Sequence, residues 1–149
     1  MTNPDNFMQI QFSAQLANLS FARVAVASFV SQLDPTVDEI EEIKTVVSEA
    51  VTNAIVHGYD SRPDAVVTVS VQMNESEVEI TVEDHGKGIE DLEQAREPLF
   101  TTKPEAEHSG MGFTIMENFV HRLEVSSEPN HGTIVRLTKR LGVNEALYN

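Results

Sequence analysis

The sequence predicts an α+β fold, a two-layer α/β sandwich in which three helices cover one face of a mixed, mostly antiparallel sheet of about five strands. Segments rich in Val and Ile occur in pairs joined by short turns, which is typical of antiparallel hairpins. Other segments carry apolar residues at helical spacing. The 149 residues fit one domain with one core, and no linker rich in Pro, Gly or Ser divides residues 1–149.

The first strand alternates apolar and polar residues, and the helix after it ends before Asp34-Pro35. The second helix begins near Thr36, which has the spacing of a capping box with Glu39, and Gly58 ends it. Its predicted buried stripe consists of Ile40, Ile43, Val47, Val51 and Ala54. In chain order the predicted elements are strand 8–13, helix 19–33, helix 36–58, strands 65–73 and 77–83, helix 112–120, and strands 123–127 and 133–138.

Residues 85–109 hold Gly, Pro, Lys and Thr with little periodicity, apart from a short helical piece at about 91–96. A loop of this length inside a compact domain is usually functional. We therefore expect it to belong to a binding site.

The composition excludes several classes of function. Ten Lys and Arg against 24 Asp and Glu give a formal net charge of -14, which opposes direct nucleic-acid binding. The chain has no cysteine, which excludes disulfides and thiolate chemistry. We expect no membrane span, because no apolar run approaches the ~18 residues needed and no signal pattern opens the sequence. The simplest location is the cytoplasm.

One face of the second helix carries a polar stripe. Glu49 and Asn53 are four residues apart and share that face with Glu42, Thr45 and His57. For Glu42 and His57, an ordinary solvated face explains the pattern. For Glu49 and Asn53, a solvated face and a functional pair are both open on this spacing alone.

Two glycine-rich segments lie further along the chain. Asp84-His85-Gly86-Lys87-Gly88 directly follows a strand; its glycines allow a tight turn and leave room for a planar ligand, and its aspartate can accept a hydrogen bond from an adenine amino group. Ser109-Gly110-Met111-Gly112 precedes a helix, whose N-terminal N–H groups favour phosphate. Neither has the Gly-Lys-Ser/Thr ending of a Walker A motif or forms a dinucleotide fold. Taken singly, each also fits a plain turn or a flexible loop.

In this order and spacing, the three motifs resemble the N, G1 and G2 boxes of the GHKL ATPase/kinase superfamily, which has the Bergerat fold. Gly132-Thr133 resembles the Gly-Thr pair whose threonine helps to hold adenine in that family. Nearly the whole chain, and in particular the segments 42–54, 98–104 and 109–118, resembles the anti-sigma F factors of endospore-forming bacteria.

The resemblance implies a serine/threonine protein kinase that uses ATP and Mg²⁺. Glu49 would accept the proton of the attacking serine, and Asn53 would supply an oxygen to Mg²⁺. Lys103 lies in the loop that looks like the ATP lid and could reach the β- or γ-phosphate, while His108 stands where a lid arginine would be the more effective phosphate partner. The nucleotide-binding residues would be Asn53, Asp84, Gly86, Gly88, Lys103, Ser109, Gly110, Met111, Gly112 and Thr133.

The same resemblance implies a homodimer that binds and inhibits a sporulation sigma factor and phosphorylates a serine on an anti-anti-sigma protein. Arg23 is either a solvated helix residue or an anchor for an acidic partner surface. The rival interpretation is a binding module in which ATP switches partner affinity without phosphoryl transfer. Chaperone, gyrase or MutL-type ATPases need further domains, and a histidine kinase normally brings a helix bearing its phosphoacceptor histidine, whereas no histidine precedes His57.

Overall fold

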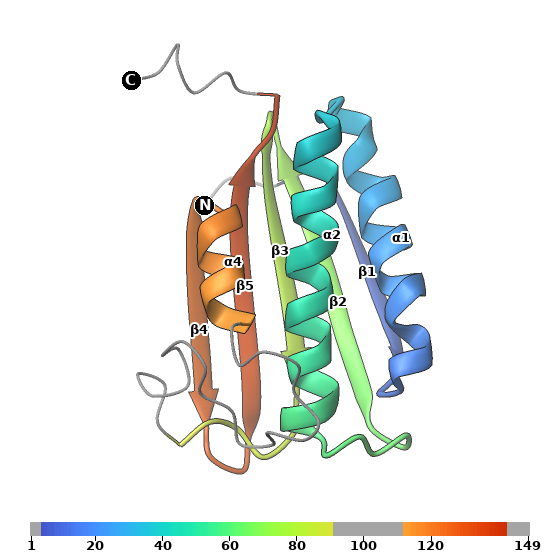
Figure 1. The fold of residues 1–149 in the computed structure, drawn as a ribbon, viewed down its shortest axis with the longest axis vertical. Coiled ribbons are helices and arrows are strands. Elements are labelled where there is room, and N and C mark those ends of the chain that lie inside the picture. The colour runs from blue at the N-terminus through green and yellow to red at the C-terminus, as the bar shows by residue number, and fades with distance from the viewer. Residues whose placement is uncertain (1–3, 91–111, 143–149) are drawn as a thin grey trace.

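The computed structural model describes residues 4–90 and 112–142, in which helices and a sheet form two layers (Figure 1). The predicted elements are confirmed within these residues, with bounds shifted by one or two residues, whereas the helical piece expected at 91–96 lies outside them. The elements in chain order are β1 (Asn6–Ser13), a 3-10 turn (Leu16–Asn18), α1 (Leu19–Val30), a second 3-10 turn (Ser31–Leu33), α2 (Val37–Thr52), the π-helical segment η3 (Asn53–Gly58), β2 (Val66–Asn74), β3 (Glu77–Asp84), α4 (Gly112–Phe119), β4 (Arg122–Glu128) and β5 (Gly132–Arg140).

The strands form one sheet in the order β1-β2-β3-β5-β4, and each neighbouring pair is antiparallel. The expectation of a mixed sheet is therefore wrong for the described residues. The chain passes from β3 through α4 to β4, and these two strands run in the same direction, but β5 inserts between them and pairs antiparallel with both. This insertion sets Thr133 of β5 opposite Asp84 of β3.

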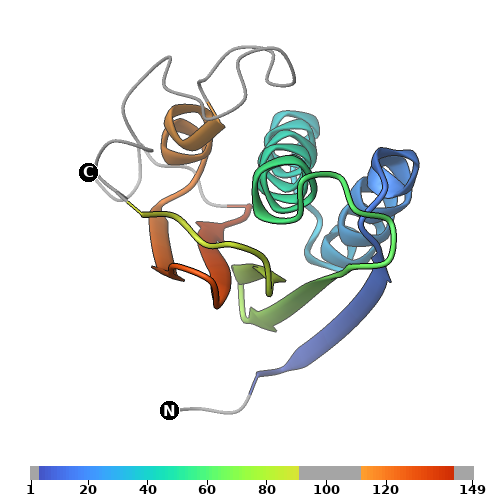
Figure 2. The ribbon, with the colours of Figure 1, turned by 90° about the horizontal axis from the view of Figure 1, so that it is seen from below.

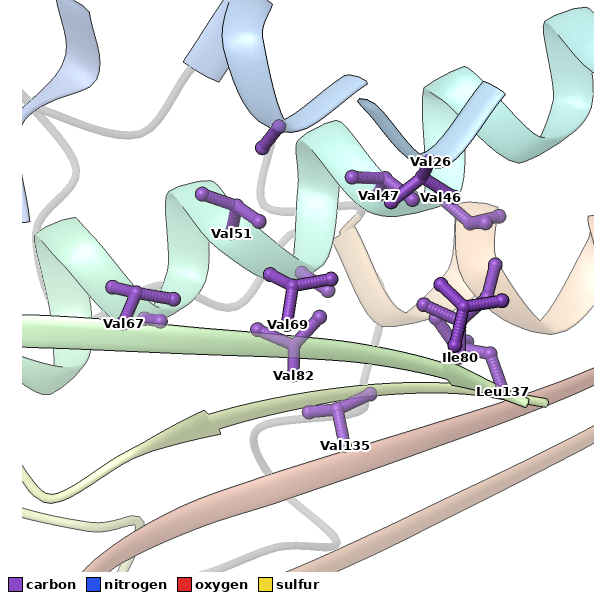
Figure 3. Close-up of a cluster of buried hydrophobic side chains, with 14 of the residues drawn as sticks. Val26, Val46, Val47, Val51, Val67, Val69, Ile80, Val82, Val135 and Leu137 are labelled. Atoms are coloured by element: carbon purple, nitrogen blue, oxygen red, sulfur yellow. The ribbon is translucent and has the colours of Figure 1, made fainter. Parts of the chain in front are cut away.

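The helices α1, α2 and α4 all lie on one face of the sheet, as Figure 2 shows from the end of the helices. Strand residues alternate between that face and solvent, so that Val67, Val69 and Val71 of β2 are fully buried. Their partners come from α2, β3 and β5, and Figure 3 shows the valine-rich cluster between the layers. Burial of this cluster is the main source of stability for the sandwich.

The predicted start and buried stripe of α2 are confirmed. The Thr36 N–H donates to Glu39 Oε1 at 2.8 Å, and the Glu39 N–H donates to Thr36 Oγ1 at 3.1 Å, which completes the capping box. Within the predicted stripe, Ile43, Val47, Val51 and Ala54 are buried and Ile40 is partly buried. The sequence of α2 thus dictates both where the helix begins and which face meets the sheet.

The interpretation of Glu42 as a solvated residue is wrong. Its Oε2 lies 3.1 Å from Nζ of Lys139, whose side chain is only 9% exposed. The same ammonium donates to the carbonyl oxygen of Phe119 at 2.6 Å, at the C-terminal end of α4. A buried lysine on β5 therefore ties α2 to α4, and the cation stands where a helix dipole favours positive charge.

The expectation that no apolar segment reaches the length of a membrane span is also wrong. The helical stretch Leu16–Leu33 covers 18 residues with a mean hydropathy of 1.3, which is enough to cross a membrane by length and composition. In the structure α1 packs against α2 and buries Ala22, Val26 and Val30 in the shared core. Packing in the helical layer thus accounts for one face of this stretch, whereas Leu16, Phe21 and Val24 are exposed.

Candidate functional site

Glu49 and Asn53 lie at the C-terminal end of α2 and are both half-buried, so their face is not a freely solvated one. Asn53 ends α2 and opens η3, where the backbone widens and the Tyr59 N–H donates to the carbonyl of Ala54 at 3.1 Å. Wide turns of this kind interrupt the regular helix and frequently occur at functional sites. Here the turn directs the chain from Asn53 toward the end of β3.

Gly112, the first residue of α4, lies directly against this pair. A Cβ placed on Gly112 would be 3.2 Å from Nδ2 of Asn53 and 3.3 Å from Oε2 of Glu49. The buried N-terminus of α4 therefore faces the carboxylate and the amide, whereas the predicted contact of Gly112 with phosphate stays a prediction. A helix N-terminus favours an anion, whereas Glu49 and Asn53 offer oxygens to a cation or a proton.

Asp84 forms the other end of the site. It ends β3 and is only 5% exposed. Burial raises the pKa of its carboxyl to about 6, although hydrogen bonds from the backbone N–H groups of Gly86 and Thr133 act in the opposite direction. The carboxyl is thus an acceptor in a largely water-free position, which suits recognition of a donor such as an adenine amino group.

The turn after Asp84 has its backbone donors satisfied within the chain. The N–H groups of three consecutive residues each donate internally: His85 to Tyr59 Oη at 2.6 Å, Gly86 to Asp84 Oδ1 at 2.9 Å and Lys87 to the Gly58 carbonyl at 2.9 Å. A phosphate-binding loop instead points free N–H groups at its ligand. This turn therefore suits the base rather than the phosphates of a nucleotide.

The glycines of the turn allow backbones to touch. A Cβ on Gly86 would lie 1.9 Å from the carbonyl oxygen of Gly58, and one on Gly88 would lie 2.2 Å from the carbonyl oxygen of Glu128. Gly88 also has a φ of 74°, which L side chains rarely adopt. In the described residues the close approach that these glycines allow is to other backbone segments of the chain, and the expectation that they leave room for the base and sugar of a nucleotide stays a prediction.

Thr133 is buried beside Asp84 at the start of β5. Its Oγ1 lies 2.8 Å from Oγ of Ser127 on β4, and Ser127 Oγ also accepts from the N–H of Ile89 at 2.7 Å. A side chain on Gly132 would meet the carbonyl oxygen of Asp84 at 2.1 Å. The Gly-Thr pair therefore packs directly around Asp84, and the expected role of Thr133 in holding adenine stays a prediction.

Among residues 4–90 and 112–142, no group of three or more His, Asp and Glu side chains could hold a metal ion. Asn53 supplies one oxygen, which fits Mg²⁺, because this ion commonly uses one or two protein ligands and takes the rest from phosphates and water. The donor set thus suits a magnesium ion that arrives with a nucleotide.

Several predicted site residues lie outside the described residues: Lys103, His108, Ser109, Gly110 and Met111. Arg23 is half-buried on α1, where its guanidinium donates to Ser48 Oγ at 3.4 Å and to Ser20 Oγ at 3.2 Å. It is thus neither fully solvated nor part of the cluster around Asp84.

The sequence reasoning missed two residues that shape the site. Gly58 was interpreted only as the end of a helix, but a Cβ there would lie 2.8 Å from Oδ1 of Asp84. Tyr59 gave no motif signal, yet its buried hydroxyl holds the backbone of His85.

The family model for the histidine kinase-like ATPase domain matches residues 12–139. Three curated relatives described as anti-sigma F factors align with 97% of this chain and 99% of their own lengths: those of Anoxybacillus flavithermus, Geobacillus kaustophilus and Bacillus subtilis, which are 61%, 60% and 59% identical.

The solved structure of the RsbU and RsbW domains of Rv1364c from Mycobacterium tuberculosis is similar in fold, with a TM-score of 0.65 at 21% identity over 93% of this chain and 32% of that one. These matches agree with the two-layer architecture and with a nucleotide-binding function. The chain belongs to the anti-sigma F factor family, whose fold is that of the histidine kinase-like ATPase domain.

Proposed function

We propose that this protein binds and inhibits a sporulation sigma factor and uses Mg-ATP to phosphorylate a serine on an anti-anti-sigma protein. The observation that carries the proposal is the arrangement of two chemically different groups of residues, which the segment Asn53–Gly58 connects because Asn53 contacts Gly112 and Gly58 contacts Asp84. The Glu49–Asn53–Gly112 cluster offers a base, a metal ligand and a helix N-terminus. The Asp84 turn offers a buried acceptor with no free N–H among its three anchored residues.

At the phosphate end, a serine oxygen attacks the γ-phosphorus of ATP, its bond to phosphorus forms as the bond to the β-phosphate oxygen breaks, and ADP leaves. Glu49 accepts the serine proton, and Asn53 provides the protein oxygen to Mg²⁺. The magnesium ion supplies charge neutralisation on the phosphates. Positioning and electrostatics account for most of the rate in phosphoryl transfer, so a small site of this composition is sufficient.

At the base end, Asp84 accepts a hydrogen bond from the adenine amino group, with Thr133 beside it. Lys103, Ser109, Gly110 and Met111 complete the phosphate contacts in this proposal. The protein acts as a homodimer in the cytoplasm, and Arg23 contributes to partner binding. The strong negative charge of the chain favours partner surfaces that carry positive charge.

The deciding experiment incubates the purified protein with γ-labelled ATP, Mg²⁺ and separately purified sigma factor and anti-anti-sigma protein. Label on a serine of the anti-anti-sigma protein supports the kinase. Release of free phosphate alone contradicts it in favour of an ATPase. If neither appears but sigma binding tightens with ATP, the protein is an ATP-gated binding switch instead.

A further inference from the structure

The Asp84 turn is held from outside by Gly58, the last residue of η3, and by Tyr59, the residue after it. We propose that Tyr59 is a positioning residue for nucleobase selection, because its hydroxyl fixes the backbone that orients Asp84. This inference rests on the proposed binding of adenine at Asp84. It adds that the choice of base depends on a residue that does not touch the nucleotide.

The hydroxyl of Tyr59 is both a hydrogen-bond donor and a hydrogen-bond acceptor. It donates to the carbonyl oxygen of Val66 at 2.8 Å and accepts from the N–H of His85 at 2.6 Å. Val66 begins β2, whereas His85 is the first residue after β3. The phenol therefore joins the start of one strand to the end of its neighbour, and the residue that it holds is bonded directly to Asp84.

Gly58 supplies the second anchor. Its carbonyl oxygen accepts from the N–H of Lys87 at 2.9 Å, and its Cα lies so close to Asp84 that a Cβ would be 2.8 Å from the carboxylate. Asp84 is thus enclosed by Gly58 on one side and by the N–H groups of Gly86 and Thr133 on others. The direction in which the carboxylate can still accept a hydrogen bond depends on how this enclosure is held.

The protonation state of the Tyr59 hydroxyl also stays the same over the pH range in which proteins work. Tyr59 is only 8% exposed, and burial raises the pKa of its phenol above 10.0. The hydroxyl therefore stays protonated and can donate to Val66 while it accepts from His85. Removing it leaves a donor and an acceptor of the backbone without their partner, which frees the turn to shift.

The hydroxyl acts on the base end alone. Its two partners belong to β2 and to the Asp84 turn, while Glu49, Asn53 and Gly112 form a separate contact at the other end of the site. Loss of the hydroxyl should therefore change recognition of the adenine amino group more than binding of the triphosphate. A general loss of stability would weaken all nucleotides alike, which makes the two explanations separable.

The test compares the full-length protein with its Tyr59→Phe variant by calorimetric titration with Mg-ATP and with Mg-purine riboside triphosphate, which lacks the 6-amino group. We expect the variant to bind ATP about tenfold more weakly and the analogue within about twofold of the original affinity. The matched control is Ser70→Ala, which removes a hydroxyl that accepts from Gln9 Nε2 at 3.2 Å on the other face of the sheet. Both affinities of this control should stay unchanged.

Equal losses for the two nucleotides, or no loss for either, would overturn the role of Tyr59 and leave the proposed adenine site intact. If the unaltered protein binds ATP no better than the analogue, the adenine site itself is wrong, and the inference fails with it. Should Tyr59→Phe not fold, Gly58→Ala perturbs the same enclosure through the contact of its Cβ with Asp84, and the same selective loss of ATP is expected.

Discussion

A Cβ on Gly112 would lie 3.2 Å from Nδ2 of Asn53, a separation tighter than nine in ten real contacts of a β-carbon. The glycine is therefore needed by the Asn53 side chain and not by its own backbone, since its φ lies outside the left-handed range. The N-terminus of α4 and the end of α2 fit together so closely that a methyl group on Gly112 would displace the Asn53 or Glu49 side chain by a few tenths of an ångström.

This contact predicts that Gly112→Ala separates activity from stability. The free energy of unfolding should change by less than about 1 kcal/mol, because alanine suits a helical backbone. Phosphoryl transfer should fall more than about tenfold, because displacement of Asn53 or Glu49 misaligns the reacting groups. Urea unfolding and transfer assays on the same preparation check both parts. Unimpaired transfer would show that the contact has no bearing on the chemistry.

Glu49→Gln should bind ATP and the sigma factor but fail to transfer phosphate. Glutamine keeps the size and one oxygen of the side chain, yet it cannot take the serine proton. The loss should be at least about a hundredfold in rate, with nucleotide affinity within about threefold. Single-turnover transfer measured beside nucleotide titration checks this. Normal transfer by the variant would remove Glu49 as the base.

Asn53→Ala should lose the magnesium-dependent part of nucleotide affinity. The variant removes the one protein oxygen assigned to the ion, so ATP binding with and without Mg²⁺ should become similar. Titrations of ADP and ATP with Mg²⁺ or with a chelator measure the difference. An unchanged dependence on Mg²⁺ would contradict the metal role of Asn53.

The pKa of Asp84 predicts a dependence of stability on pH. Because the folded chain raises this pKa from 3.8 to about 6, folding favours the protonated carboxyl, and the stability associated with it is lost as pH rises from about 4 through 6. The cost at neutral pH is about 3 kcal/mol. Asp84→Asn should therefore raise the free energy of unfolding at pH 8 and have little effect below pH 4, as urea unfolding without nucleotide can measure.

The same titration should affect ligand binding in the opposite sense. An ionised carboxylate accepts the adenine amino proton better than a protonated one, so ADP affinity should increase as pH rises through about 6. In Asp84→Asn this increase should disappear. In the unfolding experiment, an increase in the free energy of unfolding of Asp84→Asn that is equal at pH 4 and pH 8 would show that burial of the charged carboxylate is not its cause.

Lys139→Met should destabilise the fold by about 2 kcal/mol, because it leaves Glu42 and the carbonyl of Phe119 without their shared cation. The additional change Glu42→Leu should recover part of the loss, since a buried pair can be replaced by apolar side chains. Lys44→Met is the matched control: its exposed pair with Glu41, at 3.4 Å, contributes less than about 1 kcal/mol. Equal effects of the two lysine changes would contradict the anchoring role of Lys139.

Much of the fold could be predicted from the sequence because the signals are local. The capping box of Thr36 and Glu39 and the alternation along β1 each operate within a few residues. The order of the motifs and the family resemblance assigned Glu49, Asn53 and Gly112 to the phosphate end of one site and Asp84 and Thr133 to its adenine end. In both cases the structure brings the partners together.

The remaining features depend on contacts between distant parts of the chain. The pair of Lys139 with Glu42 joins residues that are 97 positions apart, and no period or motif connects them. The π-helical segment changes the helical spacing after Asn53, which a pattern based on 3.6 residues cannot represent. The roles of Gly58 and Tyr59 follow from that change, since it directs both residues toward the Asp84 turn.

The insertion of β5 between β3 and β4 also orders the assembly of the site in time. Asp84 and Tyr59 are synthesised early, but the Thr133 N–H that donates to Asp84 belongs to a strand that leaves the ribosome only after α4 and β4. Contacts between such distant segments form late in folding, because closing a long loop is entropically costly. A nascent chain that lacks β5 also lacks the Thr133 N–H that donates to Asp84, so the surroundings of Asp84 are complete only when β5 joins the sheet.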